Sequence, residues 1–541
     1  MWVLLLAACA SAPHEQYLDR YFHTFPTRAT AAGRHDLDRE LERLDAADRA
    51  SWLTFNQQTR AALAGRTDLD SELLGRAIDR EIFALTTLHT PERDPLYWTG
   101  IVSSSVVFLL VRDNRAEEAK ARARQIPRLL RTAEATLTAD AAPELCAIAA
   151  AQARASAQFF GEGFKVPEAA AALEHFAKFL DELKTRATGS PRLGANYAEV
   201  LRLSTGERDP DALLARAERD LAAKRREAEA FVEATWPGSD LRTVFARVEA
   251  DNHEAAGRKA QGAGGGRRED TTCAPPPAPC PLIDDWIAFG AKLVDEAEAF
   301  TKSHDVVTLP EPRTLVTARS PSYFVGQSVG GVYPAGPYDP EAPTLYFLPV
   351  PPDDATPAQR EAFFRDFNDH FMRMITAHEI LPGHYVQLKY AARNPHKVRA
   401  VFPDDVYVEG WGTFCERTML DLGWGGPLER VAHLKKQMEN IARTIVDIRV
   451  HTKGMTRDEV RRFVTEEAMQ GPQLASNMWT RSITSAPQIT FYYLGYTAVR
   501  RLYDDVRAAR GPAFRLRDFT DELMAIGPVP IEEVRRMMLR Q

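Results

Sequence analysis

Two histidines and two glutamates stand close together in the sequence, in a pattern suited to metal-assisted hydrolysis. His378, Glu379 and His384 lie within the segment 376–384, and Glu409 follows shortly afterwards. A catalytic zinc site uses two imidazoles, a third protein ligand and an open coordination position. It also needs a carboxylate that accepts a proton from the attacking water. We therefore predict that His378, His384 and Glu409 bind a divalent metal and that Glu379 is the general base.

The spacing of the two histidines requires a break in the helix that carries the first of them. His378 and His384 are six residues apart, and at about 100° per residue an unbroken helix would place them on nearly opposite faces. Pro382 and Gly383 lie between them; proline disrupts a helix interior and glycine permits unusual dihedral angles. The sequence thus predicts a break that returns His384 toward the metal. The alternative is a helix that simply ends there, with two ordinary histidines.

A second acidic residue follows the third expected ligand at helical spacing. Glu409 and Glu416 are seven residues apart, so they share one face if the segment is helical. Glu409 can then bind the metal while Glu416 orients a ligand histidine through a hydrogen bond. Cys415 falls off that face and is interpreted as a packing residue. Two histidines with one glutamate favour Zn²⁺, while manganese and cobalt stay open.

These two motifs resemble a known bacterial family. HEILPGHYVQ from His378 and EGWGTFCE from Glu409 are similar to the family called domain of unknown function 885, and the segment 25–35 resembles its N-terminal pattern. The resemblance implies a zincin-type metallopeptidase and, more distantly, oligopeptidases that pair an HExxH helix with a later glutamate. Dipeptidyl peptidase III, with one residue inserted in that motif, is a precedent for stretched spacing. The family name brings no substrate with it.

Further candidate site residues lie in the C-terminal part of the chain. Gln488 and Tyr492 are four residues apart on one face, and a tyrosine hydroxyl can stabilise an oxyanion. Tyr492 is the first choice for that role and Tyr493 the second. Arg481, Gln488 and Tyr493 are the expected substrate contacts, and Arg481 can bind a peptide carboxylate in a forked geometry. The resemblance to the family adds His451 as a substrate or oxyanion contact. The alternative for each of these residues is packing.

Composition and charge indicate a folded protein that does not bind nucleic acid. The chain has 541 residues with 45% hydrophobic and 26% charged side chains, which is ordinary for a globular protein. Its net charge of −7 is spread along the sequence without a basic block, and this disfavours nucleic-acid binding. Beyond the N-terminus, the sequence shows no run of about 18 uninterrupted apolar residues.

The N-terminus resembles a bacterial lipoprotein signal. An apolar run ends at Leu6-Ala7-Ala8-Cys9, which predicts a signal over residues 1–8 that is cleaved before a lipidated Cys9. The run is short and no Lys or Arg precedes it, unlike a complete signal peptide. We expect a cell-envelope or periplasmic protein with a possible membrane tether through Cys9. In such an environment Cys273 and Cys280 either form a local disulfide or stay free.

The rest of the chain predicts one mainly α-helical domain over residues 9–541. We expect a two-lobed, zincin-like fold with a helical lobe at about 15–300, a metal-site lobe at about 301–541, an exposed loop at 257–281 and the site in a cleft between the lobes. Helices are predicted at 210–236, 357–378 and 427–451, and β-type runs at 314–317, 323–325 and 344–348. By resemblance, one strand beside the metal helix pairs with the substrate backbone; alternatively, the strands only cover the core.

The function predicted from these features is zinc-dependent hydrolysis of peptide bonds, with short peptides or small amides as the expected substrates. A metal-dependent amidase acting on a non-peptide envelope substrate is one alternative. Another is a catalytically inactive, lipid-anchored binding protein, which the retained Glu379 argues against because a structural metal site needs no adjacent base. The sequence leaves the substrate, endo- versus exo-cleavage and the oligomeric state open.

Overall fold

The chain folds into two compact units, and each is described by itself. The computed structural model describes residues 13–253, 281–320, 330–352 and 355–539. Unit 1 comprises Met1–Gly189, Gly336–Asp339 and Pro395–Pro403, and unit 2 contains the remainder. The division therefore falls at residue 189 and not near residue 300, because the helices between these positions pack with the C-terminal part of the chain. The predicted lipoprotein signal, Cys9, Cys273, Cys280 and nearly all of the predicted loop lie outside the described residues.

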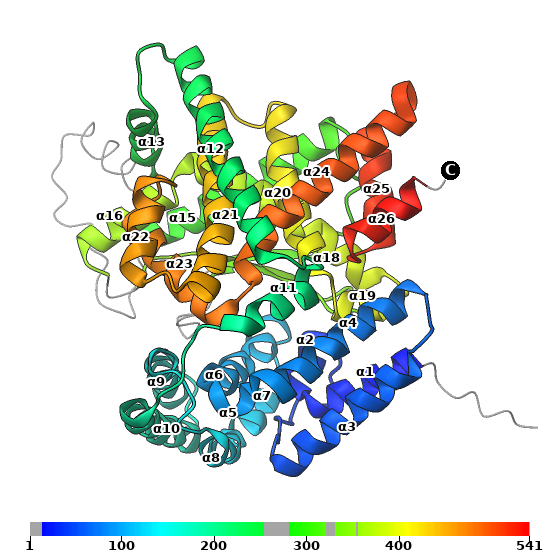
Figure 1. Cartoon of the computed structure of the whole chain (residues 1–541), viewed down its shortest axis with the longest axis vertical. Helices are drawn as coiled ribbons and strands as arrows, with labels where there is room; N and C mark the ends of the chain where they lie inside the picture. The colour runs from blue at the N-terminus through cyan, green and yellow to red at the C-terminus, as the bar shows by residue number, and fades with distance from the viewer. Residues whose placement is uncertain (1–12, 254–280, 321–329, 353–354, 540–541) are drawn as a thin grey trace, which may run out of the picture. The chain divides into compact units, whose positions relative to one another are not determined.

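Unit 1 consists of helices and connecting loops, with no strand among its described residues. Its α-helices are α1 (Pro13–Thr24), α2 (Pro26–Ala31), α3 (Ala46–Ala62), α4 (Leu69–Phe83), α5 (Thr90–Arg93), α6 (Pro95–Ser104), α7 (Ala116–Ala123), α8 (Ile126–Thr136), α9 (Pro143–Gln158) and α10 (Pro167–Arg186), blue to teal in Figure 1, and α19 (Lys397–Val401), yellow in that figure. Aspartates cap α3, α4 and α6 by accepting first-turn amides. Small buried alanines along α9 and α10 let these two helices pack closely. The helical stretch Pro95–Arg112 is long and apolar enough to cross a membrane, and half of it is buried inside the protein.

Unit 2 contains the remaining described helices, green to red in Figure 1. They are α11 (Tyr197–Thr205), α12 (Pro210–Thr235), α13 (Leu241–Ala250), α15 (Pro281–Ser303), α16 (Pro357–Asp366), α17 (Asp369–Glu379), α18 (His384–Arg393), α20 (Asp405–Asp421), α21 (Pro427–Lys453), α22 (Arg457–Glu466), α23 (Pro472–Ser485), α24 (Phe491–Arg510), α25 (Leu516–Ile526) and α26 (Ile531–Met538). The predicted helices at 210–236 and 427–451 are confirmed within two residues. The prediction of one helix over 357–378 is wrong, because Asn368 accepts a hydrogen bond from the Phe371 amide and starts a new helix.

A small sheet of three described strands belongs to unit 2. β3 (Thr344–Leu348) is fully buried and lies between β1 (Leu315–Arg319), which is parallel to it, and β2 (Gly331–Tyr333), which is antiparallel. The predicted strands at 314–317 and 344–348 are confirmed within two residues, and the predicted run at 323–325 lies outside the described residues. β2 was not among the predicted β-type runs. The structure thus has the predicted mainly helical architecture with a small sheet.

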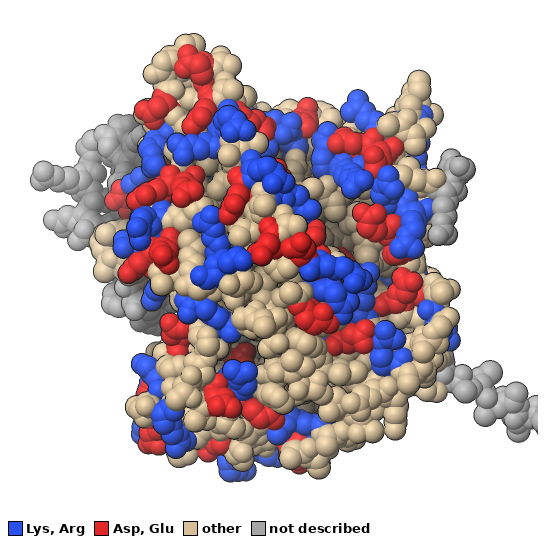
Figure 2. All heavy atoms as spheres, viewed as in Figure 1, with Lys and Arg blue, Asp and Glu red and all other residues tan. Residues whose placement is uncertain are grey.

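The metal motif is built from helices that approach each other at glycines. A Cβ atom on Gly410 of α20 would lie 2.6 Å from the backbone of Gly495 of α24, so no other residue type allows this approach. α12 and α21 also pack along one another in unit 2. On the face drawn in Figure 2, acidic and basic side chains are interspersed, as the dispersed charge of the sequence predicts.

Candidate metal centre

Three of the predicted ligands converge in unit 2. One potential ligand atom from each of His378, His384 and Glu409 lies within 4.8 Å of the other two. Glu409 Oε2 is 3.5 Å from His378 Nε2 and 3.6 Å from His384 Nε2. The two imidazole centroids are 4.7 Å apart with their planes 84° to each other. Both Nε2 atoms therefore face the same carboxylate oxygen.

The predicted helix break between the two histidines is confirmed. α17 ends at Glu379, α18 begins at His384, and the Leu381–Pro382 peptide bond is cis. A Cβ atom on Gly383 would lie 1.8 Å from the carbonyl oxygen of His378, so the chain folds back in contact with the end of α17. The Trp411 indole donates to the carbonyl oxygens of Pro382 and Gly383 at 3.0 and 3.1 Å. These contacts hold the turn that brings His384 back to His378.

The third ligand and its neighbour Glu416 come from one face of α20. Gly412 lies between them on that face, and a Cβ atom there would be 2.8 Å from the His378 ring. The imidazole of His378 therefore packs directly on the helix backbone. Its Nδ1 lies 2.7 Å from Glu416 Oε1. The structure brings these residues together as their seven-residue spacing predicts.

Glu416 also contacts a histidine that the sequence analysis missed. His433 of α21 places its Nδ1 3.2 Å from Glu416 Oε2, and all three side chains are buried. Burial would raise the pKa of Glu416, but the hydrogen bonds with His378 and His433 lower it to about 2. The carboxylate is thus ionised and accepts the Nδ1–H of His378. In the neutral imidazole this leaves the lone pair on Nε2, facing Glu409.

The converging atoms fit a divalent cation. Glu409 Oε2 is buried and has no hydrogen-bond partner among the described residues, because both Nε2 atoms are too distant for a good hydrogen bond. Burial would raise the pKa of Glu409, but its interactions with His378 and His384 hold it well below its usual range. Without a cation the two imidazoles stabilise this carboxylate as N–H donors, whereas a bound cation would be held by the two Nε2 lone pairs and the carboxylate oxygen together. Two histidines and one carboxylate are also the donor set of catalytic zinc sites.

Glu379 is adjacent to this cluster and is free to act on a water molecule. Its carboxylate is half-buried and has no hydrogen bond or ion pair with the part of the chain that the structure describes. A Cβ atom on Gly331 of β2 would lie 4.0 Å from Glu379 Oε2. Burial and the negative charge of Glu379 together raise the pKa of Tyr333, also in β2, to about 12. The base predicted from the sequence therefore faces the strand at one edge of the described sheet.

Three of the other predicted residues gather on the opposite side of Glu409. Gln488 places Nε2 3.5 Å from Glu409 Oε1 and 3.1 Å from the Tyr492 hydroxyl. Arg481 donates to Gln488 Oε1 at 2.5 Å and to the Tyr492 hydroxyl at 3.3 Å. The guanidinium of Arg443, which the sequence analysis missed, lies 4.6 Å from the centroid of the Tyr492 ring. The four side chains form one polar cluster, named here the Arg481 cluster.

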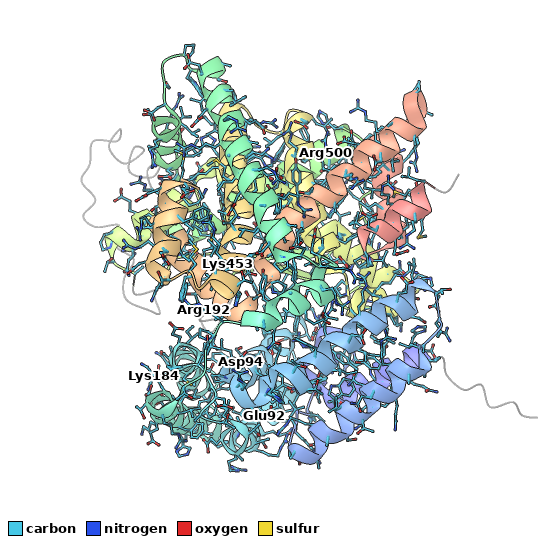
Figure 3. All side chains as sticks on the ribbon, viewed as in Figure 1. Glu92, Asp94, Lys184, Arg192, Lys453 and Arg500 are labelled. Atoms are coloured by element: carbon cyan, nitrogen blue, oxygen red, sulfur yellow. The ribbon has the colours of Figure 1, made fainter. Side chains whose placement is uncertain are left out.

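His451 is not brought to the site, which corrects its assignment as a substrate or oxyanion contact. Both of its ring nitrogens are occupied: Nδ1 accepts from the Leu193 amide at 3.1 Å, and Nε2 donates to the Ser482 carbonyl at 3.0 Å. Nearby, Arg192 donates to the carbonyl oxygens of Val450 and Met455 (Figure 3). His451 is therefore a buried histidine that joins the end of α21 to its neighbours.

Tyr493 also points elsewhere. Its hydroxyl donates to Asp220 of α12 at 2.7 Å, because consecutive residues of a helix face directions about 100° apart. Tyr493 therefore joins α24 to α12 and is not a substrate contact of this cluster. His370 contacts Glu429 and lies outside the metal ligands, and Cys415 is buried as a packing residue, as the sequence analysis expected.

Two solved structures resemble the whole chain. One, described as a "putative lipoprotein of unknown function" from Shewanella oneidensis, has 22% identity and a TM-score of 0.75, with 98% of this chain and 99% of that chain covered. The other, a "putative lipoprotein" from Colwellia psychrerythraea, has 15% identity and the same TM-score, with 97% of each chain covered. At these identities the likeness shows the fold alone.

None of the curated proteins matches the sequence. The family described as bacterial protein of unknown function (DUF885) matches residues 26–538, and the chain therefore belongs to it.

Proposed function

We propose that this protein is a zinc-dependent hydrolase that cleaves peptide bonds of short peptides, with a zincin-like catalytic centre. The observation that carries the proposal is the convergence of His378 Nε2, His384 Nε2 and Glu409 Oε2, with Glu379 as the residue that follows His378 in the chain. A structural metal site needs only ligands, whereas hydrolysis also needs a base that can accept a proton. The unpaired Glu379 favours catalysis over a purely structural site.

The chain's own residues supply binding, proton transfer and orientation. His378, His384 and Glu409 would hold the ion, and Glu416 fixes the ring of His378 through Nδ1. Bound Zn²⁺ would supply Lewis acidity that polarises a carbonyl group and makes water more acidic. Glu379 would accept a proton from the attacking water and pass it to the leaving amine.

Tyr492 is suited to stabilise the oxyanion that develops on the substrate carbonyl. Its oxygen accepts hydrogen bonds from the Gln488 amide and the Arg481 guanidinium. These two nitrogen atoms are donors only, so neither can accept a hydrogen bond from the Tyr492 hydroxyl. The hydroxyl hydrogen of Tyr492 therefore points away from both donors. A donor held in place before the reaction stabilises developing negative charge without reorganisation.

Strand β2 is the candidate for holding the substrate backbone. It is an edge strand among the described strands, and Gly331 lies beside Glu379. An extended peptide added to such an edge gains main-chain hydrogen bonds with little sequence preference. Cleavage would then follow the position of the backbone more than the identity of side chains.

The proposed location is the cell envelope, with a lipid tether through Cys9. The Leu6-Ala7-Ala8-Cys9 sequence and the likeness to two proteins described as lipoproteins support this proposal. Radiolabelled palmitate would be incorporated into the wild type and not into Cys9→Ala when both are produced in a bacterial host. Equal labelling of both chains would contradict the anchor.

The proposed activity is tested by metal analysis joined to peptide hydrolysis. We expect about one zinc per chain in the wild type and almost none in His384→Ala, which loses one of three protein ligands. His370→Ala is the matched control, because His370 lies on α17 but contacts Glu429. The wild type should cleave members of a mixed peptide library, and a chelator should abolish this cleavage. Stoichiometric zinc without any cleavage would favour an inactive binding protein, and the absence of zinc would reject the proposal.

A further inference from the structure

The Arg481 cluster contains a guanidinium whose charge has no carboxylate partner. Among residues 13–253, 281–320, 330–352 and 355–539, none places a carboxylate oxygen within 4.0 Å of Arg481, and its hydrogen bonds go to the neutral Gln488 and Tyr492. Arginine stays protonated in proteins. The carboxylates of Glu409 and Glu439 act on Arg481 only at longer range. A largely buried cation without a carboxylate in direct contact is costly, so its retention calls for an anion that arrives from outside.

The surrounding charges do not supply that anion. Lys436 and Arg443 share one carboxylate, that of Glu439, at 3.2 and 2.5 Å, and these three residues are buried. Together with Arg481 there are three cations in this part of unit 2, and the carboxylates that act on Arg481 at longer range are Glu439 and Glu409, of which Glu409 is a proposed metal ligand. The excess positive charge would be balanced by a negatively charged group of the substrate.

Polar atoms on α21, the helix that carries Arg443, are also left without hydrogen-bond partners among the described residues. Gln437 Nε2, Asn440 Nδ2 and Thr444 Oγ1 of α21 are buried and have no hydrogen bond within the described part of the chain. Buried polar groups are almost always paired with protein, water or ligand. Arg443 donates to Asn440 Oδ1 at 3.3 Å, so this side of α21 is continuous with the cluster and offers donors to a polar ligand.

The position of Arg481 relates the missing anion to the scissile bond. Gln488 bonds to Arg481 through its oxygen and approaches the metal ligand Glu409 through its nitrogen. A single amide group thus separates the guanidinium from the metal centre. Because one extended residue spans about 3.3–3.6 Å, an anion on Arg481 lies within a residue or two of the bond being cleaved.

We propose that Arg481, supported by Arg443, binds the free C-terminal carboxylate of the substrate, so that the protein removes one or two residues from the carboxyl end of short peptides. A guanidinium matches a carboxylate with two parallel hydrogen bonds. This inference rests on the proposed function and adds exopeptidase specificity to it. An acidic side chain near the scissile bond offers the same chemistry, and the test separates the two sources.

The kinetic test uses three peptides of one sequence with the zinc-loaded full chain. The first has a free C-terminus, the second a C-terminal amide, and the third an amide with glutamate as its last residue. We expect kcat/KM for the free acid to exceed that for either amide by about 100-fold, because removing one partner of a buried charge pair is strongly unfavourable. Arg481→Gln should lower the rate for the acid to that of the amide, mainly through KM, and Arg481→Lys should restore part of the difference.

A binding measurement keeps the inference testable without turnover. In a Glu379→Gln background, calorimetry should show the free acid binding about 100-fold more tightly than the amide, and Arg481→Gln should remove this difference. Arg501→Gln is the matched control, because Arg501 is an exposed arginine of the same helix as Tyr492 and should leave the difference unchanged.

The outcomes distinguish this inference from the proposed function. Hydrolysis of acid and amide at equal rates, or an acid preference that survives Arg481→Gln, would overturn carboxylate recognition while leaving the hydrolase intact. Equal use of the free acid and the glutamate-ended amide would overturn the C-terminal assignment. A preference in binding without any hydrolysis would support the subsite and count against the enzyme.

Discussion

The two units bury polar side chains in different ways. In unit 1, the segment that resembles the family's N-terminal pattern is held by side chains of different kinds that pair: the Thr30 hydroxyl donates to Asp38 at 2.6 Å and accepts from Arg122 at 2.7 Å. Arg122 Nε and Glu42 Oε2 are buried there without a hydrogen bond in the described part of the chain, but they do not converge on one point with other ligand atoms. In unit 2, Glu409 Oε2 and His433 Nε2 are buried at the metal motif without partners among the described residues. A network with its hydrogen bonds made stabilises a fold, whereas convergent groups left unpaired mark a place for a ligand.

The largest expected effect comes from removing the base while keeping the ligands. Glu379→Gln keeps the shape of the side chain but cannot accept a proton, so we expect kcat to fall by about 10²–10⁴-fold. Zinc content and melting temperature should match the wild type, because Glu379 is not a ligand. Full activity in this variant, measured on any peptide that the wild type cleaves, would reject the assigned role.

A pair of glycine substitutions compares the two units directly. Gly383→Ala places a Cβ atom 1.8 Å from the His378 carbonyl, so the turn must move, and we expect about 2–4 kcal/mol of destabilisation with loss of zinc. Gly100→Ala is the control, because a Cβ atom on this residue of α6 meets nothing within 4 Å and alanine favours helix by up to about 1 kcal/mol. Urea unfolding and metal analysis give both values. Zinc retention by Gly383→Ala would show that the turn is not needed to bring the histidines together.

Glu416→Gln tests whether the buried carboxylate orients His378. The amide keeps the size of the side chain but loses the charge that fixes the Nδ1–H of His378, so we expect zinc affinity to fall by about 10–100-fold. A zinc titration against a competing chelator measures this change. Glu429→Gln, which removes a carboxylate from the non-ligand His370, should leave the affinity unaltered. An equal loss in both variants would point to general destabilisation.

The convergence of the proposed metal ligands could be predicted from the sequence because each lies within a short motif. His378, Glu379 and His384 are neighbours, and Glu409 with Glu416 needs only helical periodicity. His433 could not be found in this way, since it reaches Glu416 through the packing of α21 against the site, which no local spacing encodes. Its signal was a polar stripe on a buried helix, His433 and Gln437 being four residues apart.

The strands and the unit boundary also could not be predicted fully from local sequence. β2 is only three residues long and lies between Gly330 and Pro334, which are typical of turns, so its pairing with β3 depends on the rest of the fold. The boundary at residue 189 falls between helices with similar apolar periodicity on both sides. Which unit a helix joins depends on its partner, as α12 joins unit 2 through Tyr493 and Asp220. Tertiary contacts of this kind leave little trace in the local sequence.

Thr30→Val should change stability without changing chemistry. It removes the hydroxyl that joins Asp38 to Arg122 and leaves both charged groups short of a partner, which costs about 1–3 kcal/mol. Zinc content and kcat per folded molecule should be unaltered, since the network belongs to unit 1. Urea unfolding beside metal analysis tests this expectation. Loss of zinc in folded Thr30→Val would show that the two networks are coupled and would undo the contrast between the units.

The smallest expected effect concerns the pH dependence of stability in unit 1. Asp94 caps α6 by accepting the Leu96 amide at 2.9 Å. Burial raises the pKa of Asp94 to about 6, against the opposing effect of that hydrogen bond. Between its unfolded pKa of about 3.9 and pH 6, Asp94 therefore binds more protons in the folded state than in the unfolded state. Its contribution makes the free energy of unfolding fall as pH rises across that window and then level off.

Asn is an equally good cap without a charge, so Asp94→Asn should remove that part of the slope and raise stability at pH 7. Urea unfolding from pH 4 to pH 7 measures both effects; an unchanged slope in the variant would mean that Asp94 is ionised in the folded protein at every pH tested.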